Sequence, residues 1–123
     1  MRMERAQQRM TAAVPEADVV ITNPTHYSIA LQYKIDDMSA PILVAKGVNY
    51  LAMRIREVAK ANDVPLVENS PLARALYAGV DVNEEIPPEH FKAVAEVIGF
   101  IMRKRGVLPA QASPSAEGNP SVQ

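Results

Sequence analysis

Two apolar stretches on either side of a short polar interruption decide the fold of this chain: residues 18–31 are DVVITNPTHYSIAL. Residues 18–22 are rich in β-branched apolar side chains, which is typical of a buried strand. Residues 27–33 alternate between apolar and more polar side chains, which predicts a second strand. Because a four-residue turn separates the two strands, we expect them to be neighbours in a sheet, and the sequence leaves their relative direction open.

Short apolar runs and amphipathic segments follow each other along the rest of the chain. They predict a third strand over 42–45, a tight turn at Lys46-Gly47, a helix over about 48–61 and a fourth strand over 64–67. A second helix should have Ser70 as its N-cap and end at Gly79. A last helix should open at Pro87-Pro88, and its buried stripe should consist of Phe91, Val94, Val97 or Ile98, and Ile101. This order predicts an α/β fold, with a small four-stranded mixed sheet flanked by helices. The third and fourth strands should be joined by a right-handed parallel crossover.

The two ends of the chain differ from the middle in composition. Residues 1–14 are polar and rich in good helix formers, so we expect a polar helix or arm that belongs to a longer chain. Residues 15–106 carry all the predicted sheet and should form the folded domain. Residues 107–123 contain many Pro and Ser side chains and few apolar ones, which predicts a disordered tail.

Composition excludes several classes of function. Thirteen Lys and Arg against fourteen Asp and Glu give a net charge of −1. Such a charge does not support a strong grip on nucleic acid or on an anionic membrane surface. The chain has no Cys and two His, so a disulfide scaffold and a thiolate metal site are excluded and a histidine-built zinc site is disfavoured. We therefore expect no cofactor and no metal.

The interruption itself, Asn23-Pro24-Thr25-His26, is the candidate site of chemistry. The simpler interpretation is a turn, because Asn and Pro both favour one. The second interpretation starts from Pro24, whose nitrogen carries no hydrogen and cannot attack the Asn23 side chain, as happens in ordinary asparagine decay. The reverse attack stays open: Asn23 Nδ2 attacks the Asn23 carbonyl carbon, a succinimide forms and the bond to Pro24 breaks.

Such a cleavage depends on geometry and on proton transfer. A side-chain amide is a poor nucleophile, so the turn has to hold a near-attack arrangement. His26 can take a proton from the amide or give one to the leaving nitrogen, and the sequence does not decide between them. Thr25 can hydrogen-bond within the turn. The second Asn-Pro pair, Asn119-Pro120, lies in the predicted tail without a nearby histidine, and we expect it to stay intact.

Asn-Pro-Thr-His directly after Asp-Val-Val-Ile-Thr resembles the signature of the FlhB/YscU family, the export-switch proteins of type III secretion systems. The match continues with Ala45-Lys46-Gly47, with Pro71-Leu72-Ala73-Arg74-Ala75-Leu76-Tyr77 and with Glu85-Ile86-Pro87, so that it covers about residues 5–105. These stretches are more similar to the flagellar branch than to the injectisome branch. The family's membrane half is absent from the sequence, so the chain resembles the cytoplasmic C-terminal domain alone. The resemblance implies that residues 1–14 are the helix or arm that links the domain to this membrane half.

The resemblance implies autocatalytic cleavage between Asn23 and Pro24, with residues 1–23 and 24–123 remaining associated. It also implies a switch of flagellar export from rod and hook proteins to filament proteins, in response to a hook-length ruler protein. The implied partners are export-gate membrane proteins, the ruler and the exported subunits, with no nucleic acid. The implied location is the cytoplasmic face of the bacterial inner membrane. Since cleavage happens once per molecule, we do not expect an enzyme with a separate substrate.

Two other functions stay open. The first is an uncleaved protein-docking module of a secretion apparatus, in which the motif is only a turn. The second is a small α/β enzyme, although the sequence lacks a nucleophile-base pair, a metal-ligand constellation and a Gly-rich loop. The candidate partner-binding residues are Arg74, a lone charge in the apolar PLARALY stretch, and Tyr77 at the end of that stretch.

Overall fold

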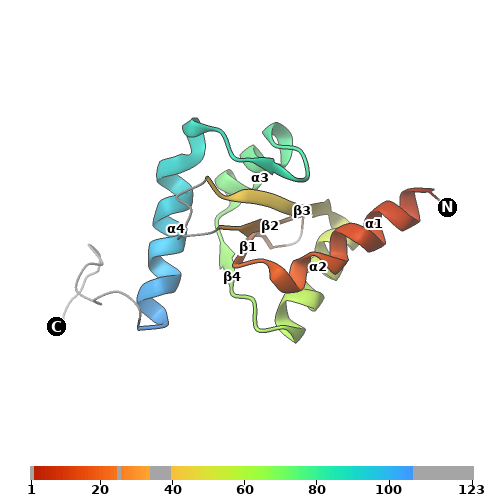
Figure 1. The fold of residues 1–123 in the computed structure, drawn as a ribbon, viewed down its shortest axis with the longest axis horizontal. Helices are drawn as coiled ribbons and strands as arrows, with labels where there is room; N and C mark the ends of the chain where they lie inside the picture. The colour runs from red at the N-terminus through yellow and green to blue at the C-terminus, as the bar shows by residue number, and fades with distance from the viewer. Residues whose placement is uncertain (1, 25, 34–39, 107–123) are drawn as a thin grey trace. The chain divides into compact units, whose positions relative to one another are not determined.

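The computed structural model describes residues 2–24, 26–33 and 40–106. The elements in chain order are α1 (Arg2–Ala12), η1 (Val14–Glu16), β1 (Val19–Asn23), β2 (Tyr27–Gln32), β3 (Ile42–Val48), α2 (Asn49–Ala61), β4 (Leu66–Glu68), α3 (Ser70–Gly79), β5 (Glu84–Glu85), η3 (Pro88–His90) and α4 (Phe91–Lys104). Figure 1 shows the strands of one mixed sheet, with α2 and α3 packed against it. The predicted α/β fold is confirmed.

The strands of the sheet lie in the order β4-β1-β2-β3-β5. β1 pairs with β2 in antiparallel direction, from Val19 opposite Leu31 to Asn23 opposite Tyr27. On its other edge β1 pairs with β4 in parallel direction, and β2 pairs with β3 in antiparallel direction. β3 therefore runs parallel to β4, as the crossover prediction requires, with β2 and β1 between them; the handedness stays a prediction.

Both faces of the central strands are buried. On one face, a cluster that includes Val20, Ala30 and Ile55 joins β1, β2 and α2. The neighbouring residues of the same strands point to the opposite face, and these too are fully buried. On that face α3 packs against β1 and β2 (Figure 1). This two-sided burial explains why residues 19–21 form a continuous apolar run instead of an alternating one.

The prediction of four strands is one strand short. β5 consists of Glu84 and Glu85, which pair with Leu43 and Ile42 of β3. Both acidic side chains are exposed, and acidic residues are depleted in strands. Because β5 has only two residues and is held by backbone pairing with β3, it has no apolar pattern that could be detected in the sequence.

The chain divides into two compact units, residues 1–91 and residues 92–123. The whole sheet and α1 to α3 belong to the first unit. In α4, Val94, Val97 and Ile101 are buried as predicted, whereas Phe91 is 44% exposed, so its assignment to the buried stripe is wrong. The predicted boundaries at residues 14 and 106 stay predictions, and the tail lies outside the described residues.

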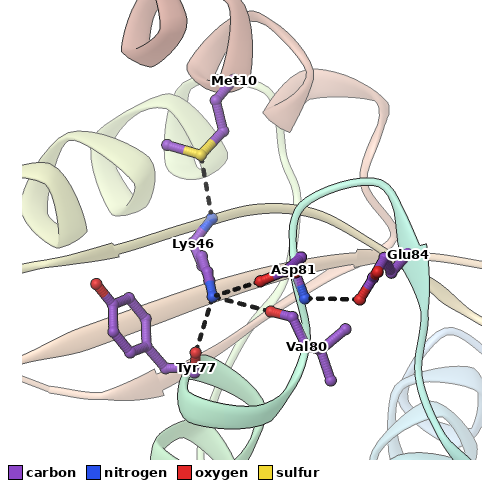
Figure 2. A network of polar contacts seen from close by, with 6 residues as sticks. All are labelled: Met10, Lys46, Tyr77, Val80, Asp81 and Glu84. Atoms are coloured by element: carbon purple, nitrogen blue, oxygen red, sulfur yellow. Dashed lines mark hydrogen bonds and ion pairs between the residues drawn. The ribbon is translucent and has the colours of Figure 1, made fainter. Parts of the chain in front are cut away.

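The side chain of Lys46, which lies on β3, caps the C-terminal end of α3. β3 extends to Val48, so Lys46 lies within the strand and not in the predicted turn. Its Nζ donates to the carbonyl oxygens of Tyr77 at 2.8 Å and of Val80 at 2.9 Å (Figure 2). The Tyr77 ring centroid lies 4.8 Å from Nζ, and an Asp81 carboxylate oxygen lies 4.0 Å from it. The last carbonyls of a helix lack partners within the helix and carry partial negative charge, so this lysine holds α3 against β3.

Replacing Lys46 by Met should lower the free energy of unfolding by about 2 kcal/mol, because two hydrogen bonds from a charged donor are lost while the aliphatic stem is kept. Urea denaturation measures this change. The matched control is Lys60→Met, which removes an exposed lysine from the last turn of α2. Equal unfolding free energies for the two variants would contradict the role given to Lys46.

Candidate functional site

The Asn-Pro-Thr-His motif forms the tight turn of the hairpin between β1 and β2. Asn23 is the last residue of β1 and lies opposite Tyr27, the first residue of β2. The His26 N–H donates to the Asn23 carbonyl oxygen at 2.8 Å, which closes a four-residue turn. Pro24 holds its second position, where the fixed φ of proline is favoured. Thr25 lies outside the described residues, so its hydrogen bond within the turn stays a prediction.

The Asn23 side chain is held by a residue far away in the sequence. Ser70 Oγ donates to Asn23 Oδ1 at 3.2 Å, across a separation of 47 residues. Asn23 and Ser70 are both partly buried, whereas Pro24 and His26 are exposed. The Asn23 side-chain amide is therefore anchored at the edge of the core, next to the exposed Pro24.

The pairing of β1 with β4 brings Ser70 to the motif. The parallel ladder ends with Thr22 opposite Glu68. One further hydrogen bond follows, from the Asn69 N–H to the Thr22 carbonyl oxygen at 2.9 Å. The next residue on each side of this bond is Asn23 on one chain segment and Ser70 on the other. Strand register thus determines which residue reaches the asparagine.

The prediction of Ser70 as the N-cap of α3 is wrong by one residue. Asn69 is the N-cap, and its Oδ1 accepts a hydrogen bond from the Leu72 N–H at 3.2 Å. Asn caps a helix as well as Ser does, and Pro71 is accommodated within the first turn in either register. The ladder bond made by the Asn69 N–H selects the earlier register. As a result the Ser70 hydroxyl is available to Asn23, a contact that sequence reasoning missed.

The other side of the turn is held by β3, α2 and α3. The His26 carbonyl oxygen accepts a hydrogen bond from the Asn49 N–H at 3.0 Å, where β3 passes into α2. The Tyr27 ring packs against the Tyr77 ring, with centroids 5.1 Å apart. Tyr77 is thus a half-buried anchor of the hairpin. Arg74 is exposed and makes no hydrogen bond or ion pair with the described residues, and a partner-binding role for both residues stays a prediction.

Within residues 2–24, 26–33 and 40–106, no three His, Asp or Glu side chains lie together in a way that could hold a metal ion. Over these ranges there is also no helix with both the length and the apolar character needed to cross a membrane. The candidate site is therefore the turn between β1 and β2, which contains the motif singled out from the sequence.

A family model described as the FlhB HrpN YscU SpaS Family matches residues 1–101. The chain belongs to this family. It is 52% identical over 102 residues to the flagellar biosynthetic protein FlhB of Bacillus subtilis, a match that covers 83% of this chain and 28% of that protein. It is 45% identical over 122 residues to FlhB of Salmonella typhimurium, covering 98% of this chain and 32% of that protein. The chain thus spans about a third or less of these relatives, and the resemblance stated from its motifs is confirmed.

Solved structures from the FlhB HrpN YscU SpaS family share the fold. The cytoplasmic domain of FlhB from Shewanella putrefaciens is 38% identical, with a TM-score of 0.78 over 93% of this chain and 85% of that one. Two mutated EscU C-terminal domains are 30% identical with a TM-score of 0.70; each covers 74% of this chain, and 91% and 90% of the EscU chains are covered. One carries Ala in place of an Asn, and the other carries Ala in place of the Pro that follows it.

The reassigned cap can be tested by stability. Asn69→Ala should lower the free energy of unfolding by about 1 kcal/mol, because the first turn of α3 loses its N-cap. Ser70→Ala should cost less, because its hydroxyl does not cap the helix. Urea denaturation of the two variants checks the order, and a larger loss for Ser70→Ala would return the cap to Ser70.

Proposed function

We propose that this chain is the cytoplasmic domain of a flagellar export-apparatus protein, and that it cleaves itself between Asn23 and Pro24. The observation that carries the proposal is the 2.8 Å hydrogen bond from the His26 N–H to the Asn23 carbonyl oxygen. The carbon of this carbonyl is the atom that the Asn23 side chain would attack. The turn therefore aims a donor at the oxygen on which negative charge would develop.

The proposed reaction forms one bond and breaks one. Asn23 Nδ2 attacks the Asn23 carbonyl carbon, and an electron pair moves onto the carbonyl oxygen, where the backbone N–H of His26 stabilises it. The intermediate collapses to a succinimide, and the Pro24 nitrogen leaves with the proton that Nδ2 gives up. The His26 side chain, which is exposed beside the turn, relays this proton. Water later opens the succinimide.

The two products should stay together. Residues 1–23 contribute β1, which is hydrogen-bonded on one edge to β2 and on the other to β4. Val19, Val20 and Ile21 are fully buried, and burial of each such side chain contributes about 1.5 to 3 kcal/mol. Neither the ladders nor this burial requires the bond between Asn23 and Pro24.

Cleavage would act as a switch by changing an exposed surface. It turns the hairpin turn into two chain ends, and Pro24 and His26 are exposed where a partner can contact them. We propose that other export-gate membrane proteins and the hook-length ruler protein bind the cleaved and uncleaved surfaces differently. This binding would take place at the cytoplasmic face of the bacterial inner membrane. Export would then switch from rod and hook proteins to filament proteins. Because each molecule reacts once, the domain is not an enzyme with a separate substrate.

The wild-type chain should give two bands on a denaturing gel and one species in native size-exclusion chromatography. Asn23→Ala should give one band, because the nucleophile is absent. The pair Asn119-Pro120 is an internal control: it lies outside the described residues, has no histidine nearby in the sequence, and should stay uncut. An Asn23→Ala chain that still splits at residue 23 would rule out the cyclisation mechanism.

His26→Ala should slow cleavage about 100-fold or more, the usual contribution of a general acid-base group. The rate can be followed on denaturing gels after synthesis in a cell-free system. His90→Ala, which removes the other histidine of the chain, is the matched control and should cleave at the wild-type rate. A wild-type chain that stays intact on prolonged incubation would instead favour the uncleaved docking module.

A further inference from the structure

We propose that Ser70 is a positioning residue for the cleavage; this inference rests on the proposed function. The Ser70 hydroxyl donates to Asn23 Oδ1 at 3.2 Å. The bond joins the first residue of α3 to the last residue of β1. It reaches the side chain that carries the nucleophile, at the end opposite the attacking nitrogen.

A donor at Oδ1 selects one orientation of the Asn23 amide. The two ends of a carboxamide have similar shape, and rotation by half a turn exchanges them. Only the oxygen end can accept a hydrogen bond, since the NH₂ group is a donor. The Ser70 hydroxyl therefore fixes where Oδ1 lies and, with it, where Nδ2 lies. This removes an unproductive orientation before the reaction begins.

The same hydrogen bond favours the reactive form of the nucleophile. When Nδ2 loses a proton, the negative charge of the resulting anion is shared with Oδ1. A hydroxyl that donates to Oδ1 stabilises this charge, and hydrogen bonds to charged acceptors are stronger than those to neutral ones. The N-terminal end of α3, where Ser70 lies, carries the positive end of the helix dipole and acts in the same direction. Ser70 keeps its own proton throughout.

The position of Ser70 is set without help from Asn23. The Asn69 N–H is bonded to the Thr22 carbonyl oxygen at 2.9 Å, and the Asn69 side chain caps α3 through the Leu72 N–H at 3.2 Å. The next residue, Pro71, has a fixed φ. The donor is therefore in place before charge develops on Oδ1, which is the condition for electrostatic preorganisation.

The test compares cleavage rates of wild-type chain, Ser70→Ala, Ser70→Thr and Ser28→Ala after pulse synthesis in a cell-free system. Ser70→Ala should cleave about tenfold more slowly, the size expected from a lost hydrogen bond together with a lost orientation. Ser70→Thr keeps a hydroxyl at the same position and should restore the rate to within about twofold. At acidic, neutral and mildly alkaline pH the Ser70→Ala rate should fall by the same factor, because the hydroxyl does not titrate there.

Ser28→Ala is the matched control. Its hydroxyl belongs to the same hairpin and is fully buried, but donates to the Ala52 carbonyl oxygen at 2.9 Å. The Ser28→Ala chain should cleave at the wild-type rate even if thermal unfolding shows that it is less stable than the Ser70→Ala chain. The positioning role of Ser70 would be contradicted if Ser28→Ala cleaved as slowly as Ser70→Ala, or if Ser70→Thr did. The Ser70 hydroxyl would then only stabilise the structure.

The possible failures are distinct. If the wild-type chain cleaves, Asn23→Ala does not, and Ser70→Ala keeps the wild-type rate, then the role of Ser70 is wrong and the proposed function stands. If the wild-type chain does not cleave at all, the proposed function falls and the role of Ser70 falls with it.

Discussion

The interior position of β1 in the sheet is the constraint on which the rest of the structure depends. This five-residue strand is paired on both edges, with β2 and with β4, and its side chains are buried on both faces of the sheet. Its last residue is Asn23, so the motif begins at the end of a strand that is fixed on both edges. A weak nucleophile such as a side-chain amide needs this kind of fixed starting geometry.

α3 contacts the hairpin on both sides of its turn. Its first residue, Ser70, contacts Asn23 before the turn, and Tyr77 near its end contacts Tyr27 after the turn. Lys46 of β3 holds the C-terminal end of the same helix. Because these contacts lie on both sides of the Asn23–Pro24 bond, they would hold the two new ends after cleavage, and the products need not separate for the surface at the turn to change.

Much of the fold could be predicted from local patterns, because apolar runs and caps act over a few residues. The neighbouring strands β1 and β2, the two helices α2 and α3 and the position of the motif were all predicted from such patterns, whereas the antiparallel direction of β1 and β2 was left open. What could not be predicted depends on register between distant segments. The two-residue β5 is held only by pairing with Leu43 and Ile42. The shift of the α3 cap to Asn69 follows from one ladder bond to Thr22, and the contact of Ser70 with Asn23 follows from that shift.

Intact-mass spectrometry of the freshly synthesised wild-type chain over time tests the central claim most directly, namely that Asn23 attacks its own carbonyl within a preformed turn. Cyclisation predicts two pieces, residues 1–23 and 24–123, whose masses at first add up to that of the uncut chain, with one water molecule added to the smaller piece as the succinimide opens. If the first detectable pieces already contain the added water, or if the chain stays whole, the claim is contradicted.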